Sequence, residues 1–61
     1  MNEEFEMSNG TVVKFYSSLS YDGINVYVST KLTPEEKQKF KSELKSERDV
    51  ATITYEYSLQ N

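Results

Sequence analysis

The chain contains no cysteine, no histidine and no tryptophan. It therefore lacks the commonest general base, the thiolate nucleophile and the most frequent ligands of transition metals. Its two glycines provide neither a phosphate-binding glycine loop nor a dinucleotide-binding fingerprint. The paired glutamates Glu3/Glu4 and Glu35/Glu36 lie at the N-terminus and at a predicted helix start, where solvation and capping explain them. We expect neither an enzyme nor a protein that binds a cofactor or a metal.

Long apolar runs and a strong excess of one charge are also missing. The acidic start of the sequence argues against a secretory signal, and no segment is long enough to span a bilayer. We therefore expect a cytoplasmic protein without a membrane partner. The net charge of −3 is mildly acidic, which disfavours nucleic acid as a partner.

The 61 residues form one small domain, residues 1–61. A domain of this size buries only about 60% of the surface that its unfolded chain exposes. Neither disulfides nor a zinc site can reinforce it, so self-association into a homodimer is an expected means of extending the core. The hydrophobic content of 36% and the strand-like alternation of residues exclude a disordered chain.

The first glycine marks a hairpin loop of three residues, Ser8-Asn9-Gly10, with Gly10 in the left-handed conformation. This loop sets Phe5 opposite Val13, so that two apolar side chains share a face. It also sets Glu4 opposite Lys14, where an exposed ion pair favours the same register.

The second glycine predicts a two-residue turn, Asp22-Gly23. That turn pairs Leu19 with Val26 and Ser17 with Val28. The two predicted hairpins agree on which side of the strands faces inward.

Alternation of apolar and polar residues predicts strands at about 3–7, 11–19, 24–30 and 50–58. The inward side of the second and third strands is apolar: Val13, Phe15, Leu19, Ile24, Val26 and Val28. The fourth strand has a side of greater apolar volume, which we expect to face the core: Ala51, Ile53, Tyr55 and Tyr57. Its other side carries Val50, Thr52, Thr54 and Glu56.

A helix is predicted over residues 34–46. Thr33 is the N-cap, and Glu36 completes a capping box three residues later. Phe40 and Leu44 lie one turn apart, so we expect them to face the sheet.

These elements predict an α+β domain, a small antiparallel or mixed β-sheet in the order β-β-β-α-β, with one helix packed on one face. Because the helix carries the chain back to the other end of the sheet, the fourth strand runs parallel to the third. It can pair beside the third strand or beside the first, and the sequence leaves both open.

The face of the sheet turned away from the helix is the candidate binding surface. In the predicted register Tyr16 lies opposite Ser29 and Tyr27 lies opposite Ser18, which places the two tyrosines diagonally across neighbouring strands. Tyrosine is enriched at interface hot spots, although it also suits a half-exposed strand with no binding role. The predicted protein-binding residues are Val12, Lys14, Tyr16, Tyr27, Thr52, Thr54 and Glu56.

Together these features predict a non-enzymatic protein-interaction module. We expect a small inhibitor or adaptor that covers a surface of a larger protein and can homodimerise; short chains of this kind are frequent among phage and mobile-element regulators. Binding can use the sheet face, an edge strand or the helix. The alternatives are a nucleic-acid-associated protein that uses the tyrosines or the lysine-rich helix, and a structural subunit that only self-assembles. Steep salt dependence would indicate nucleic acid.

Overall fold

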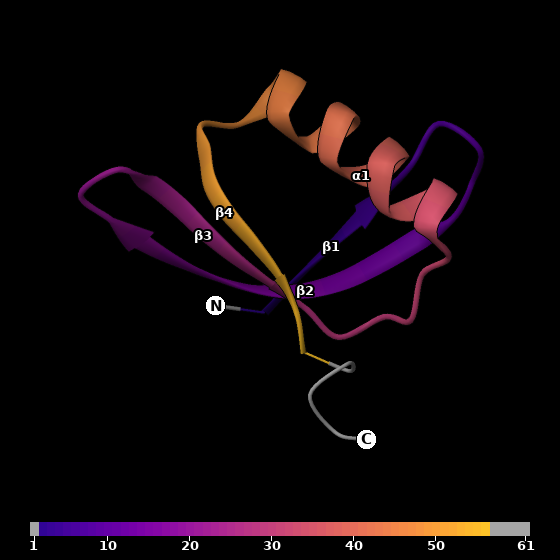
Figure 1. The fold of residues 1–61 in the computed structure, drawn as a ribbon, viewed down its shortest axis with the longest axis horizontal. Helices are drawn as coiled ribbons and strands as arrows, with labels where there is room; N and C mark the ends of the chain where they lie inside the picture. The colour runs from indigo at the N-terminus through magenta and orange to yellow at the C-terminus, as the bar shows by residue number, and fades with distance from the viewer. Residues whose placement is uncertain (1, 57–61) are drawn as a thin grey trace.

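A computed structural model describes residues 2–56, which form four strands and one helix (Figure 1). The elements are β1 (Asn2–Glu6), β2 (Val12–Ser20), β3 (Gly23–Val28), α1 (Pro34–Glu47) and β4 (Val50–Tyr55). β1, β2 and β3 are antiparallel, and β4 pairs with β3 in parallel, giving the order β1-β2-β3-β4. The predicted α+β fold is confirmed, and β4 lies beside β3. Tyr57 and the end of the predicted fourth strand lie outside the described residues.

The first hairpin has the predicted register. Gly10 has a φ of +90°, and its N–H donates to the carbonyl oxygen of Met7 at 2.9 Å. The Met7 N–H donates to the Thr11 carbonyl at 2.8 Å, which closes the loop over three residues. Phe5 lies opposite Val13. The glycine supplies the positive φ that this loop requires.

The second hairpin turns one residue earlier than predicted. Its two turn residues are Tyr21 and Asp22, whereas Gly23 is the first residue of β3 and has a φ of +133°. A Cβ at Gly23 would lie 2.6 Å from the carbonyl oxygen of Asp49, which accepts the N–H of Ile24 at 2.9 Å. Gly23 therefore permits a close approach of two backbone segments as well as a positive φ.

The pairing of β2 with β3 is consequently shifted by two residues from the prediction. Leu19 pairs with Ile24 instead of Val26, and Ser17 pairs with Val26 instead of Val28. Because side chains alternate with a period of two, a shift of two residues leaves each of them on its predicted face.

β4 begins with an irregularity that reverses one prediction. Ile24 pairs with Val50, but the next residue, Asn25, pairs with Thr52, so Ala51 is the extra residue of a bulge. Val50 therefore packs against the core, and the prediction that it faces outward is wrong.

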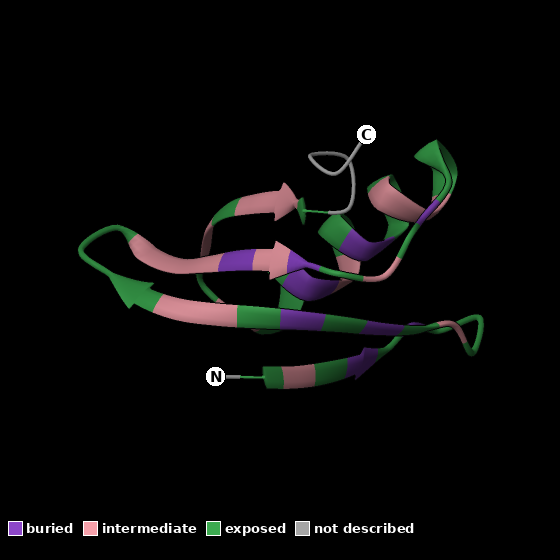
Figure 2. Cartoon of the chain, turned by 90° about the horizontal axis from the view of Figure 1, so that it is seen from below, coloured by how far each residue is buried: buried purple, intermediate pink, exposed green. Residues whose placement is uncertain are grey.

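The core lies between α1 and the face of the sheet that the helix covers, here called the inner face (Figure 2). Phe40 is fully buried, and its ring lies 5.8 Å from that of Phe5 and 6.1 Å from that of Phe15, between centroids. The buried hydrophobic residues in the described chain are Phe5, Met7, Val13, Phe15, Val26, Val28, Leu32, Phe40 and Leu44. Ile24, Val50, Ile53 and Tyr55 are partly buried against them.

Leu19 does not join this core. Its side chain was predicted to point inward, yet it is 86% exposed. β1 reaches along β2 only as far as Tyr16, which pairs with Asn2, and the tip of the β2–β3 hairpin extends beyond α1 (Figure 1). Leu19 therefore has β3 on one side only, and among the described residues neither a strand on its other side nor the helix covers it.

The helix begins as predicted. The Thr33 N–H donates to the Glu36 carboxylate at 2.8 Å, and the Glu36 N–H donates to the Thr33 hydroxyl at 3.2 Å. These reciprocal bonds form the capping box and satisfy backbone donors that the helix leaves unpaired. Phe40 and Leu44 are buried on the face of α1 that meets the sheet.

Removing the cap should weaken the domain. We expect Thr33→Ala to lower the free energy of unfolding by about 1 kcal/mol, because the Glu36 N–H loses its acceptor. Urea denaturation measures the change. Ser42→Ala is the matched control, since it removes an exposed hydroxyl from the middle of α1 and should leave stability unchanged or slightly raised. Equal stability of Thr33→Ala and the wild type would contradict the assigned cap.

Candidate interaction surface

The outer face, opposite the one that α1 covers, contains a continuous row of side chains across all four strands. Asn2 pairs with Tyr16, Tyr16 with Tyr27, and Tyr27 with Thr54. This row results from the two hairpins and from the parallel addition of β4. It places the aromatic pair on the two central strands of the sheet.

The two tyrosines lie directly opposite each other. The predicted partners Ser29 and Ser18 are wrong, because the register of the second hairpin is shifted by two residues. The ring centroids are 6.1 Å apart with an interplanar angle of 42°. Tyr16 is 49% exposed, and Tyr27 is half-buried. Aromatic rings at this distance attract each other, so the pair holds both side chains in place. The result is a stiff apolar surface whose hydroxyl groups are polar.

Val12 and Lys14 continue the outer face along β2. Val12 is 45% exposed. Lys14 is exposed and lies opposite Glu4, as predicted. The backbone of Lys14 is also held at the end of β3, because its N–H donates to the Thr30 hydroxyl at 2.8 Å and its carbonyl accepts the Ser29 N–H at 3.0 Å.

β4 contributes two threonines to this face. Thr52 is exposed, and its hydroxyl donates to the side-chain oxygen of Asn25 at 2.9 Å. Thr54 is half-buried beside Tyr27, and Glu56 is exposed just after the strand. The sheet thus brings six of the seven predicted residues onto one face, with Glu56 beyond its end. Their role in binding stays a prediction.

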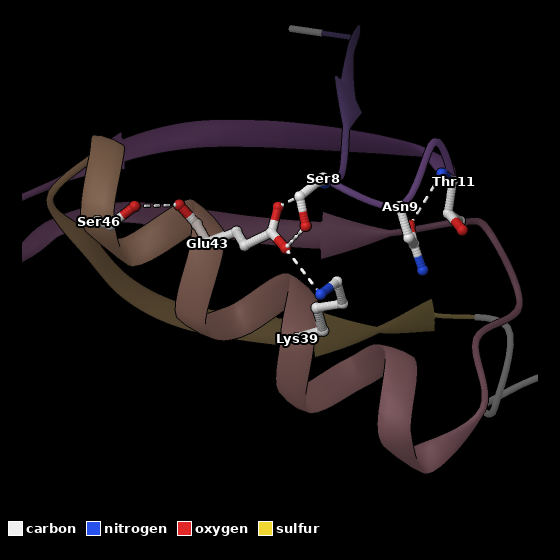
Figure 3. Close-up of polar contacts among 6 residues, drawn as sticks. All are labelled: Ser8, Asn9, Thr11, Lys39, Glu43 and Ser46. Carbon is white, nitrogen blue, oxygen red and sulfur yellow. Dashed lines mark hydrogen bonds and ion pairs between the residues drawn. The ribbon is translucent and has the colours of Figure 1, made fainter.

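A polar cluster on the other side joins the first hairpin loop to α1 (Figure 3). The Glu43 carboxylate accepts the Ser8 N–H at 2.8 Å and the Ser8 hydroxyl at 2.7 Å, and Lys39 lies 3.5 Å from it. Within the loop, the Asn9 side chain accepts the Thr11 N–H at 3.0 Å. The bonds from Ser8 hold the pKa of Glu43 below its ordinary value. Sequence reasoning missed this contact.

A second polar cluster lies between β1, β2 and the end of α1. The Glu3 carboxylate accepts a bond from Arg48 at 2.6 Å and one from the Ser17 hydroxyl at 2.7 Å. Both bonds lower the pKa of Glu3, and the bond from Ser17 has the larger effect. The Arg48 guanidinium also lies over the Phe15 ring, 5.6 Å from its centroid. Sequence reasoning missed the cluster, and the only signal was the position of Glu3 on the same side of β1 as Phe5.

Both carboxylates are poor candidates for general bases. Each accepts a hydrogen bond from a serine hydroxyl, and in some enzymes such a bond to a base activates the serine as a nucleophile. However, a lowered pKa makes a carboxylate a weaker base, and each is engaged by a cation, Arg48 for Glu3 and Lys39 for Glu43. The two clusters join elements of the fold.

The Glu43 contact predicts acid sensitivity. A carboxyl whose pKa is lower in the folded chain stabilises the fold fully above its ordinary value near 4.5, and this contribution is lost as the pH falls through the lowered pKa. We expect the urea midpoint of Glu43→Gln to fall less steeply with acidification than that of the wild type. Glu6→Gln changes the net charge equally, at an exposed carboxylate on the outer face, and serves as the control. Identical pH profiles of Glu43→Gln and the wild type would contradict the prediction.

Residues 2–56 show no group of acidic side chains that could hold a metal ion and no helix long and apolar enough to cross a membrane. An open hollow of about 490 Å³ lies where β1 and β2 meet the end of β3. Its lining residues are Asn2, Glu3, Glu4, Lys14, Phe15 and Ser29.

Comparison with protein-family models, with curated protein sequences and with solved structures finds no match to this chain. The functional interpretation of the outer face therefore depends on its own geometry and chemistry.

Proposed function

We propose that this chain is a non-enzymatic protein-interaction module of the cytoplasm, a small inhibitor or adaptor of the kind that phages and mobile elements encode. It acts by covering a surface of a larger protein with its outer face. The same face can also pair with a second copy of the chain.

The observation that carries this proposal is the Tyr16–Tyr27 pair at the centre of the outer face. Its rings are held 6.1 Å apart on the two central strands, and Tyr16 keeps 49% of its surface exposed. α1 covers the other face, and no described element covers this one (Figure 1). The interface residues that contribute most to binding free energy are enriched in tyrosine, because its large, stiff ring loses little conformational entropy on binding. Val12, 45% exposed, adds apolar area to the same face.

The proposal is tested by capturing partners from a lysate of the source organism with the tagged chain. The test variant is Tyr16→Ser with Tyr27→Ser, shown by circular dichroism to remain folded. Tyr21→Ser is the matched control, because Tyr21 is fully exposed at the β2–β3 turn, away from the tyrosine pair. We expect a stoichiometric protein that the wild type and the control retain and the test variant loses. Recovery of the same proteins by all three baits would show that the tyrosine pair of the outer face is not the binding site.

Sedimentation of the purified chain tests for a second copy. A mass that rises with concentration for the wild type, but not for the Tyr16→Ser, Tyr27→Ser variant, would place the homodimer on this face. A nucleic-acid partner would be recognised by an affinity that falls steeply as salt is raised, whereas contacts of the tyrosine pair should change little.

A further inference from the structure

The two edges of the sheet differ in charge. β1, at one edge, contains three glutamates in its sequence NEEFE, whereas β4, at the other edge, has the uncharged sequence VATITY. Free edges carry backbone groups ready to pair with another strand, and natural sheets protect them with charge, proline or bulges. β1 is protected by its charge. The bulge of β4 lies at its start, so the remainder of that edge has neither charge nor proline.

The core is also less complete at the β4 edge. Phe5 and Met7, near the β1 edge, are only 7% and 2% exposed. Val50, Ile53 and Tyr55 pack against the core from β4 but are only partly buried. An additional strand beside β4 would cover these side chains and bury further apolar surface.

α1 places positive charge above this edge. Lys37 lies over the ring of Tyr55, 4.8 Å from its centroid, which fixes that side of the helix above β4. Lys41 and Lys45 follow at intervals of four residues, so they project from the same side, and both are exposed. We call Lys37, Lys41 and Lys45 the lysine row. Glu43 projects from the opposite side of α1, toward Ser8 in the first hairpin loop.

The spacing of the lysine row matches that of an extended chain. Residues four apart in a helix are separated by about 6 Å along its axis. Alternate residues of a strand, which lie on one face, are separated by about 6.6 Å. Acidic side chains at alternate positions of a strand beside β4 would therefore each place a carboxylate near one lysine. The methylene groups of the same acidic side chains would cover Ile53.

We propose that the outer edge of β4, which pairs with no other strand of the described residues, binds an extended acidic segment of a partner protein by strand addition, with alternate carboxylates of that segment facing the lysine row. Backbone hydrogen bonds hold such a segment, and the side chains on one face give it specificity. Antiparallel pairing with β4 of a second copy would bring two lysine rows together, and like charges across an interface oppose association. The site goes beyond the proposed function, since the Tyr16–Tyr27 pair takes no part in it.

The test titrates the ¹⁵N-labelled chain with a capped synthetic peptide of alternating threonine and glutamate. A peptide of alternating threonine and lysine, equal in length, is the control. We expect the glutamate peptide to shift the backbone amide signals of Val50–Tyr55, and the lysine peptide to leave them unchanged. Lys41→Glu with Lys45→Glu should weaken binding of the glutamate peptide by about tenfold and should allow the lysine peptide to bind.

Two further measurements complete the test. The Tyr16→Ser, Tyr27→Ser variant should bind the glutamate peptide as the wild type does, which separates this site from the outer face. Equal binding of both peptides, no binding of either, or shifts confined to β1 and β2 would overturn the proposal. Shifts of the Val50–Tyr55 amide signals as the concentration of the chain alone is raised would assign the edge to a second copy instead.

Discussion

Phe40→Ala should lower the free energy of unfolding by about 3–5 kcal/mol. Phe40 is the aromatic side chain that α1 inserts into the core. It is fully buried, and its ring contacts those of Phe5 and Phe15 at centroid distances of 5.8 and 6.1 Å. Truncation removes its transfer free energy and leaves a cavity that the neighbouring rings can fill only in part. A domain of this length has a total stability of about 3–9 kcal/mol, so a large fraction of the variant should be unfolded.

Urea and thermal denaturation followed by circular dichroism measure this effect. Tyr21→Ala is the matched control, because it also removes an aromatic ring, from a residue that is fully exposed at the β2–β3 turn. Its stability should stay within about 0.5 kcal/mol of the wild type. A folded Phe40→Ala variant as stable as this control would mean that α1 presents a different side to the sheet.

Gly23→Ala should lower the free energy of unfolding strongly, although it adds only one methyl group. Its added Cβ would lie 2.6 Å from the carbonyl oxygen of Asp49, which is backbone and cannot rotate away. Alanine must also adopt a φ of +133°, which L-residues rarely do. Strain of this kind costs about 1–3 kcal/mol before the steric overlap is added, so we expect a loss of more than about 3 kcal/mol.

Gly10→Ala provides the comparison, since Gly10 also has a positive φ, +90°, but a Cβ there would meet no atom within 4 Å. We expect it to cost about 1–2 kcal/mol, the penalty of the left-handed conformation alone. Denaturation of the two variants side by side separates the effect of φ from the effect of close approach. Equal losses at Gly10 and Gly23 would show that β3 and the segment at Asp49 can move apart at little cost.

Features set by neighbouring residues were predictable from the sequence. The capping box at Thr33 and Glu36 needs only residues three apart, and the loop at Gly10 fixes its own register. Alternation of apolar and polar residues gave the inner and outer faces of β2 and β3, and it placed Tyr16 and Tyr27 on the same face. The candidate surface could therefore be predicted as a set of residues, although the direct pairing of Tyr16 with Tyr27 could not.

Features set by distant segments were not predictable. The position of the second turn depends on how closely Asp49 approaches Gly23, and no local pattern near the turn contains that information. Alternation gives the direction of Leu19 but says nothing of whether another element covers it. The neighbour of β4 and the bond from Ser8 to Glu43 likewise depend on how α1 returns across the sheet.

The separation of core and outer face has a consequence for how the molecule can change. The buried hydrophobic side chains of the described chain belong to the inner face, to α1 and to the connecting segments, and the outer face supplies none of them. Substitutions at Val12, Tyr16 or Thr52 should therefore change the chemistry of the outer face while the packing beneath α1 stays intact. Such a sheet is a scaffold on which selection, or an engineered library, can replace one set of contacts with another without having to rebuild the fold.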